Sequence, residues 1–327
     1  MGDYMIIGHQ RIMENLEKTI DKNQLSHSYL FEGEEALGKK MVALYFAKTL
    51  LCKEQGLKPC NNCNSCLKFD NFNHPDFQLI EPKKNSIPRK AIEDLIKSIN
   101  IAPLESKRRI IIIDDSHKMG LEAQNCLLKT LEEPPSYINM ILITCNINDL
   151  IPTIISRCEV IKFHPVENKK IENLLKSKYD KTEEEASFIA HFTQGSVGKS
   201  IALSQSQDFL NKREETLNII HSIINGDKAT IFNSIDFFID NKDSIEDILD
   251  IIIYWFRDLI IYKKIGNQHL IINRDKLDLL SQQFFLDEDK INDIIEKVLE
   301  TKKYVNGNVN YQLSIELMLL NIQEVGI

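Results

Sequence analysis

A glycine-rich loop near the N-terminus, "GEEALGKK" at residues 33–40, almost fits the phosphate-binding pattern G-x-x-x-x-G-K-[ST]. Gly33, Gly38 and Lys39 stand where the pattern requires them. Such a loop aims backbone N–H groups at phosphate oxygens, and its lysine reaches the terminal phosphates. Lys40 replaces the Ser or Thr that holds magnesium, and an ammonium group has no lone pair to give the metal. We therefore expect nucleotide binding to be weak or absent, and hydrolysis to be absent.

Two carboxylates, Asp114 and Asp115, end the apolar run "RRIIIIDD" and form the second half of the same candidate site. Asp114 is suited to orient a metal through water. The next position usually carries a glutamate that positions the attacking water, and Asp115 is one methylene shorter. A misplacement of about 1 Å can lower a rate roughly a hundredfold. Both departures predict a degenerate site, unless Lys40 points to solvent and another group holds the metal.

Four cysteines follow with the spacing C-x7-C-x2-C-x2-C: Cys52, Cys60, Cys63 and Cys66. Four thiolates at this spacing are typical of a closed tetrahedral zinc site that stabilises structure. An iron–sulfur cluster is the alternative, although the C-x3-C-P continuation is missing, and a redox role is less favoured. His74 is a weaker substitute ligand. The other cysteines are interpreted as small packing residues: Cys126, Cys145 and Cys158.

The string "SRC" at residues 156–158 places Arg157 just before a predicted strand. A lone arginine is usually a surface or salt-bridge residue. In ring ATPases, an arginine at this place projects into a neighbour's site and stabilises charge on the transferring phosphate. Such a residue can raise the rate roughly a thousandfold or more.

Short apolar runs alternate with helical patterns in the first half of the chain. The apolar runs lie at 28–33, 76–82, 108–115, 139–146 and 158–163, and the helical patterns at 39–52, 89–99 and 121–135. This alternation predicts a doubly wound, mostly parallel sheet. Beyond about residue 164 the chain is expected to be helical. We predict an α/β core at 1–165 with a zinc module at about 52–66, a small helical domain at 166–206, and a second helical domain at 207–327.

The composition of the 327 residues is that of a soluble globular protein, with 27% charged and 43% apolar residues. The net charge of -8 repels nucleic acid, so contact with DNA requires a local basic patch or a partner. The most apolar stretch, 245–266, is interrupted by charges and predicts a buried helix rather than a membrane span. Without a signal peptide pattern, we expect the protein in the cytoplasm, where disulfides are rare.

Several strings in order along about residues 5–205 resemble the delta-prime subunits of the bacterial DNA polymerase III clamp loader, which are AAA+ proteins. They include "IIGHQRIMENLEKTI", "GEEALGKK", "CNNCNSC", "HPDFQLI", "LEEPP" and "SRC". The last two are the most telling, because they mark clamp-loader proteins rather than P-loop proteins in general.

The resemblance implies a ring of AAA+ subunits that opens the sliding clamp and places it on primed DNA. This chain would be a rigid stator without intrinsic ATPase activity, although part of the polymerase holoenzyme. Arg157 would complete the ATP site of an adjacent gamma/tau motor subunit, and delta would be a further partner. Residues 166–206 would be the lid, and 207–327 would join the collar of this hetero-oligomer. Thr144 lies where the first sensor falls, and Gly198 replaces a sensor arginine.

The main alternative is an active gamma/tau-type motor of the same loader, against which Lys40, Asp115 and Gly198 argue. A P-loop nucleotide or nucleoside kinase is disfavoured by the cysteines, the "SRC" string and the helical second half. A zinc-dependent nucleic-acid binder is disfavoured by the net charge and by the lack of an aromatic–basic pattern.

Overall fold

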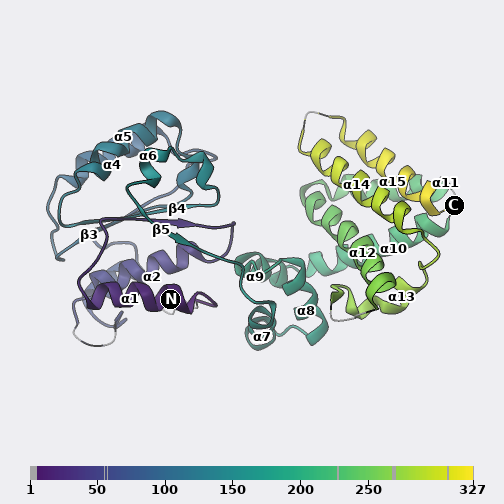
Figure 1. Ribbon diagram of the computed structural model, residues 1–327, viewed down its shortest axis with the longest axis horizontal. Helices are drawn as coiled ribbons and strands as arrows, with labels where there is room; N and C mark the ends of the chain where they lie inside the picture. The colour runs from purple at the N-terminus through teal and green to yellow at the C-terminus, as the bar shows by residue number, and fades with distance from the viewer. Residues whose placement is uncertain are drawn as a thin grey trace. The chain divides into compact units, whose positions relative to one another are not determined.

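The computed structural model describes residues 6–54, 56, 58–226, 228–266, 270–307 and 309–326. The chain divides into two compact units, Met1–Ile171 with Gly195–Lys199, and Glu172–Gln194 with Ser200–Ile327. Both units are drawn in Figure 1. The finer division into core, lid and C-terminal domain stays a prediction.

A five-stranded parallel sheet forms the centre of the first unit. Its strands are β1 (Ser28–Glu32), β2 (Phe77–Ile80), β3 (Arg109–Ile113), β4 (Ile138–Thr144) and β5 (Glu159–Lys162). Their order across the sheet is β2-β3-β4-β1-β5, and every neighbouring pair is parallel. The predicted α/β fold with a mostly parallel sheet is confirmed. Because all strands run the same way, the residues that follow them gather at one edge, where ligands bind in such sheets.

Helices cover both faces of this sheet (Figure 1). One face carries α1 (Gln10–Asp21), α2 (Lys39–Leu51) and α3 (Asn64–Asp70), and the other carries α4 (Arg89–Ile99), α5 (Leu121–Glu132) and α6 (Pro152–Ile155). Strand β3 explains the continuous apolar pattern. Ile110 and Ile112 pack in the core under α2, while Ile111 and Ile113 pack in the core under α4 and α5. A strand buried on both faces therefore reads as an unbroken apolar run.

The second unit is helical in the residues that the structure describes. Its helices include α8 (Glu183–Phe192), α10 (Gln207–Asn225), α11 (Lys228–Asp240), α12 (Ile245–Ile265), α13 (Leu277–Ser281), α14 (Glu288–Val305) and α15 (Tyr311–Gly326). Two more, α7 (Asn168–Lys178) and α9 (Val197–Gln205), include residues of both units.

Helix α12 is the buried helix expected from the apolar stretch. Its Asp258 is fully buried and accepts hydrogen bonds from the backbone N–H groups of Ile272 and Asn273. Arg257 donates to the same carboxylate at 2.8 Å. The buried carboxylate of Asp258 therefore has hydrogen-bond donors and a positively charged partner. Within the described part of the chain, no helix has both the length and the apolar character to cross a membrane.

Candidate sites at the phosphate loop, the cysteine cluster and Arg157

The phosphate loop, residues 33–40, joins β1 to α2 as predicted. Gly33 has φ 153°, and a Cβ added there would lie 2.7 Å from the carbonyl oxygen of Phe163, so the position requires glycine. Gly38, at φ 95°, is the N-cap of α2. Lys39 is only 7% exposed, and its Nζ donates to the carbonyl oxygen of Gly33 at 2.6 Å and to that of Glu34. Burial lowers the pKa of Lys39. The lysine therefore contacts carbonyl oxygens of its own loop.

Lys40 contacts the carboxylate that was expected to orient magnesium. Its Nζ lies 2.9 Å from Oδ2 of Asp114 and 2.5 Å from Oε1 of Glu81. These carboxylates follow β3 and β2, which are neighbours in the sheet. Burial acts to lower the pKa of Lys40, but the hydrogen bonds to Glu81 and Asp114 outweigh it and raise the pKa. The ammonium group of Lys40 thus forms two ion pairs, while its side chain stays 39% exposed.

Asp115 and Thr144 both make local contacts. Asp115 has φ 47°, and its Oδ2 lies 2.8 Å from Nζ of Lys118. Thr144 is fully buried; its hydroxyl donates to the carbonyl oxygen of Asn146 at 2.8 Å and accepts from the N–H of the same residue. These bonds satisfy both side chains without a nucleotide. Their assignment to a nucleotide site stays a prediction.

The segment Gly195–Lys199 belongs to the same unit as the phosphate loop and contacts its tip. The N–H of Gly198 donates to the carbonyl oxygen of Ala36 at 2.8 Å. Ser196 Oγ donates to that of Glu35 at 3.3 Å. A Cβ at Gly198 would lie 2.9 Å from Cβ of Ala36, closer than side chains normally approach. Gly198 thus permits the close approach to the loop, and an arginine there would require the loop to shift.

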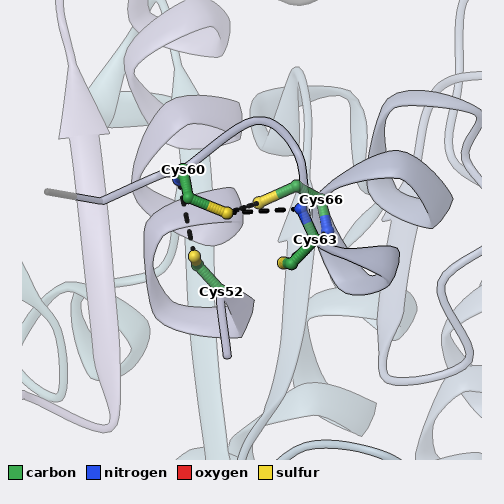
Figure 2. Close-up of side chains that lie close together, drawn as sticks. All are labelled: Cys52, Cys60, Cys63 and Cys66. Atoms are coloured by element: carbon green, nitrogen blue, oxygen red, sulfur yellow. Dashed lines mark hydrogen bonds between the residues drawn. The ribbon is translucent and has the colours of Figure 1, made fainter. Parts of the chain in front are cut away.

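The cysteine cluster consists of the four residues found by spacing, Cys52, Cys60, Cys63 and Cys66 (Figure 2). Cys52 is the C-cap of α2, and Cys66 lies on α3. The four sulfur atoms all lie within 4.8 Å of one another, and those of Cys60 and Cys66 are 3.9 Å apart. Zinc–sulfur bonds of about 2.3 Å in a tetrahedron put the sulfur atoms about 3.8 Å apart. The cluster therefore fits a zinc ion with four thiolate ligands.

Backbone N–H groups point at three of these sulfur atoms. Cys60 donates to Cys52 at 3.5 Å, Cys63 to Cys60 at 3.3 Å, and Cys66 to Cys63 at 3.4 Å. Burial acts to raise the pKa of Cys63, but N–H donation from Cys66 and Lys53 lowers it to about 6. Such bonds stabilise the thiolate form that binds metal.

His74 is not a fifth member of the cluster. Its ring Nε2 lies 2.9 Å from Oγ of Ser65, and its Nδ1 accepts from the N–H of Asp76 at 3.1 Å. The histidine is buried, and these contacts satisfy both ring nitrogens. It therefore acts as a packing residue beside the cluster.

Arg157 lies between α6 and β5 with its side chain 32% exposed. Its Nη1 donates to the carbonyl oxygen of Thr153 at 2.9 Å, and its Nη2 lies 2.6 Å from Oε1 of Glu132. Ser28 of β1 donates its Oγ to the carbonyl oxygen of Arg157 at 2.6 Å. Sequence reasoning found the arginine but not its partners. The only signal for Glu132 was its place in the "LEEPP" string.

Comparison with known proteins gives consistent matches along the chain. The family model described as DNA polymerase III, delta subunit, matches residues 8–167, and the one described as its C terminal matches 207–324. The chain is 33% identical to DNA polymerase III subunit delta' of Bacillus subtilis over 319 residues, 96% of each protein. It is 30% identical over 230 residues to DNA polymerase III subunit tau/gamma of Haemophilus influenzae, spanning 33% of that protein.

Among solved structures, the fold resembles that of a DNA polymerase III gamma subunit-related protein from Thermotoga maritima. The TM-score is 0.50, with 19% sequence identity, over 96% of this chain and 99% of that one. At this identity, the likeness concerns the fold alone.

Proposed function

Because the chain belongs to the DNA polymerase III delta-subunit family, we propose that it is a stator, a clamp-loader subunit that hydrolyses no ATP itself. It works in the cytoplasm within a hetero-oligomer of gamma/tau ATPase subunits and a delta subunit. It meets the sliding clamp and primed DNA through that assembly. The C-terminal helices contribute to the collar that holds the subunits together.

The observation that carries the stator proposal is the position of Lys40. Metal-assisted phosphoryl transfer needs magnesium held between the phosphates and an acidic group of the protein. Here the acidic group, Asp114, is already neutralised by an ammonium group at 2.9 Å. A magnesium ion would have to displace that charge or bind beside it, and like charges repel. The loop keeps its shape, while its metal position is filled by a side chain.

Arg157 is the residue that acts on a neighbouring subunit. It is partly exposed, and a guanidinium group carries a permanent charge with donors suited to phosphate oxygens. Placed at the transferring phosphate of an adjacent motor, it stabilises the charge of the transition state. This contribution is worth roughly a thousandfold in rate.

Zinc has a structural role in this proposal. The four cysteines would hold it, and metal binding supplies folding energy to a short segment with little core of its own. No reaction step involves the cluster.

Two substitutions with opposite expected results test the proposal in a reconstituted loader. Arg157→Ala should lower ATP hydrolysis by the complex, because a motor site loses its arginine. Lys39→Ala in this chain should leave hydrolysis unchanged, because its own loop does no chemistry. Loss of activity with Lys39→Ala would identify the chain as a motor subunit instead. Unchanged activity with Arg157→Ala would remove that residue from the mechanism.

A further inference from the structure

The ion pair between Glu132 and Arg157 joins two strings that lie apart in the sequence, "LEEPP" and "SRC". We propose that Glu132 is a positioning residue, which holds the Arg157 guanidinium in the orientation that the neighbouring ATP site needs. This inference rests on the proposed function of Arg157 and adds a residue to it.

Arg157 is held at both ends. At the backbone, the buried hydroxyl of Ser28 on strand β1 donates to the carbonyl oxygen and fixes its position. At the tip, Thr153 and Glu132 accept from Nη1 and Nη2, at 2.9 and 2.6 Å. Ser28 lies on β1, Thr153 on α6, and Glu132 is the last residue of α5. Three different elements of the core thus define where one surface side chain lies.

The guanidinium group keeps donors for a ligand in this arrangement. Arginine presents five N–H groups in a planar fork. Thr153 accepts from Nη1 and Glu132 from Nη2, with Ser156 Oγ a further 3.4 Å contact of Nη1. Within the described residues, Nε has no hydrogen-bond partner. The N–H of Nε is therefore available to donate to a phosphate oxygen while Glu132 holds Nη2.

In this proposal Glu132 raises the rate of ATP hydrolysis by restricting the Arg157 side chain, rather than through its negative charge. A free arginine side chain populates many rotamers, and this conformational entropy is lost when the guanidinium group binds a phosphate. A side chain already held by Glu132 loses less freedom at that moment. Glu132 is 48% exposed, so solvent screens its pull on the guanidinium charge. The ordering effect of such an exposed pair corresponds to about a two- to fivefold change in rate.

The test measures ATP hydrolysis by the reconstituted loader with substitutions in this chain. Glu132→Ala should lower kcat about two- to fivefold with little change in KM, because Arg157 acts on the transition state. Glu132→Gln retains an acceptor oxygen and should restore part of the loss. Glu133→Ala is the matched control. Glu133 follows Glu132 in the chain, and its exposed carboxylate forms no ion pair within the described residues. Thermal melting should be the same for all three.

A double substitution separates positioning from a general structural effect. In the Arg157→Ala background, Glu132→Ala should have no further effect. A similar fall in that background, or an unchanged or raised kcat in the single variant, would overturn the inference. If Arg157→Ala alone has no effect, the proposed arginine role fails first. If Arg157→Ala is harmful and Glu132→Ala is silent, the positioning role alone fails.

Discussion

Helix α2 joins the phosphate loop to the cysteine cluster, and its two ends differ in what their residues retain. At the first turn, the glycines and Lys39 keep the shape of a phosphate site, but the ammonium of Lys40 contacts the metal-orienting carboxylate. At the last turn, Cys52 joins three further thiols in a complete ligand set. One end has the backbone of a phosphate loop with a lysine where the pattern has Ser or Thr, and the other brings four candidate metal ligands together.

Whether a sequence motif can bind its ligand therefore depends on the side chains that would touch the ligand, and not on the backbone shape alone. The fold itself requires a glycine turn at the loop, because a Cβ added to Gly33 would lie 2.7 Å from the carbonyl oxygen of Phe163. The four thiols offer a different kind of evidence. Their sulfur atoms lie within 4.8 Å of one another, which is the arrangement that a tetrahedral zinc site requires.

The largest expected effect concerns the cysteine cluster. Cys63→Ser should reduce bound zinc from one per chain to nearly none, because a closed site needs all four ligands. Structural zinc contributes on the order of 10 kcal/mol to small domains, so the module should also become sensitive to protease. Elemental analysis of the purified variant measures the loss, with Cys126→Ser as control. A colourless metal-free wild-type protein would contradict this account, and a brown one would indicate iron–sulfur.

A smaller effect is expected at the contact between the two helices that carry the cluster. Lys48 of α2 has a fully buried side chain, and its Nζ lies 2.7 Å from Oδ1 of Asp70 on α3. Asp70→Asn removes the negative charge beside that buried ammonium group and should destabilise the protein by about 3 kcal/mol in urea unfolding. The matched control is Asp94→Asn, because its pair with Lys97 is exposed and should contribute less than about 1 kcal/mol. Equal midpoints for the two variants would refute the assignment.

The third and smallest of these effects concerns the metal position of the phosphate loop. Lys40→Thr frees Asp114 and supplies a hydroxyl ligand, so magnesium-dependent ATP binding should strengthen about tenfold. Lys40→Met removes the charge without adding a ligand and should gain less. Isothermal titration with and without magnesium measures both. If neither variant gains affinity, Lys40 is not what limits nucleotide binding. The close contact between Gly198 and Ala36 of the phosphate loop would then be the cause.

Much of the fold follows from local sequence pattern. The run at 108–115 became β3, and the helical pattern at 121–135 became α5, which ends at Glu132 ahead of two prolines. Both are readable because burial on two faces and proline chemistry act within a few residues. The spacing of the four cysteines likewise predicted their convergence.

The partners of the site residues could not be predicted, because they depend on which strands become neighbours. Lys40 meets Glu81 only because β2 lies beside β3, and Arg157 meets Glu132 only because α5 ends near the turn before β5. Sequence reasoning therefore left open whether Lys40 points to solvent. The contacts of Lys40 depend on tertiary structure, because its ammonium group pairs with carboxylates that the fold brings near it.

The central claim is that this chain keeps the phosphate loop but not its chemistry. The most direct test uses the purified chain alone with magnesium and ATP, following nucleotide binding and phosphate release in the same sample. The account predicts no turnover, with weak or no binding. Steady turnover that Lys39→Ala abolishes would contradict it and would show the chain to be a motor subunit with an unusual metal site.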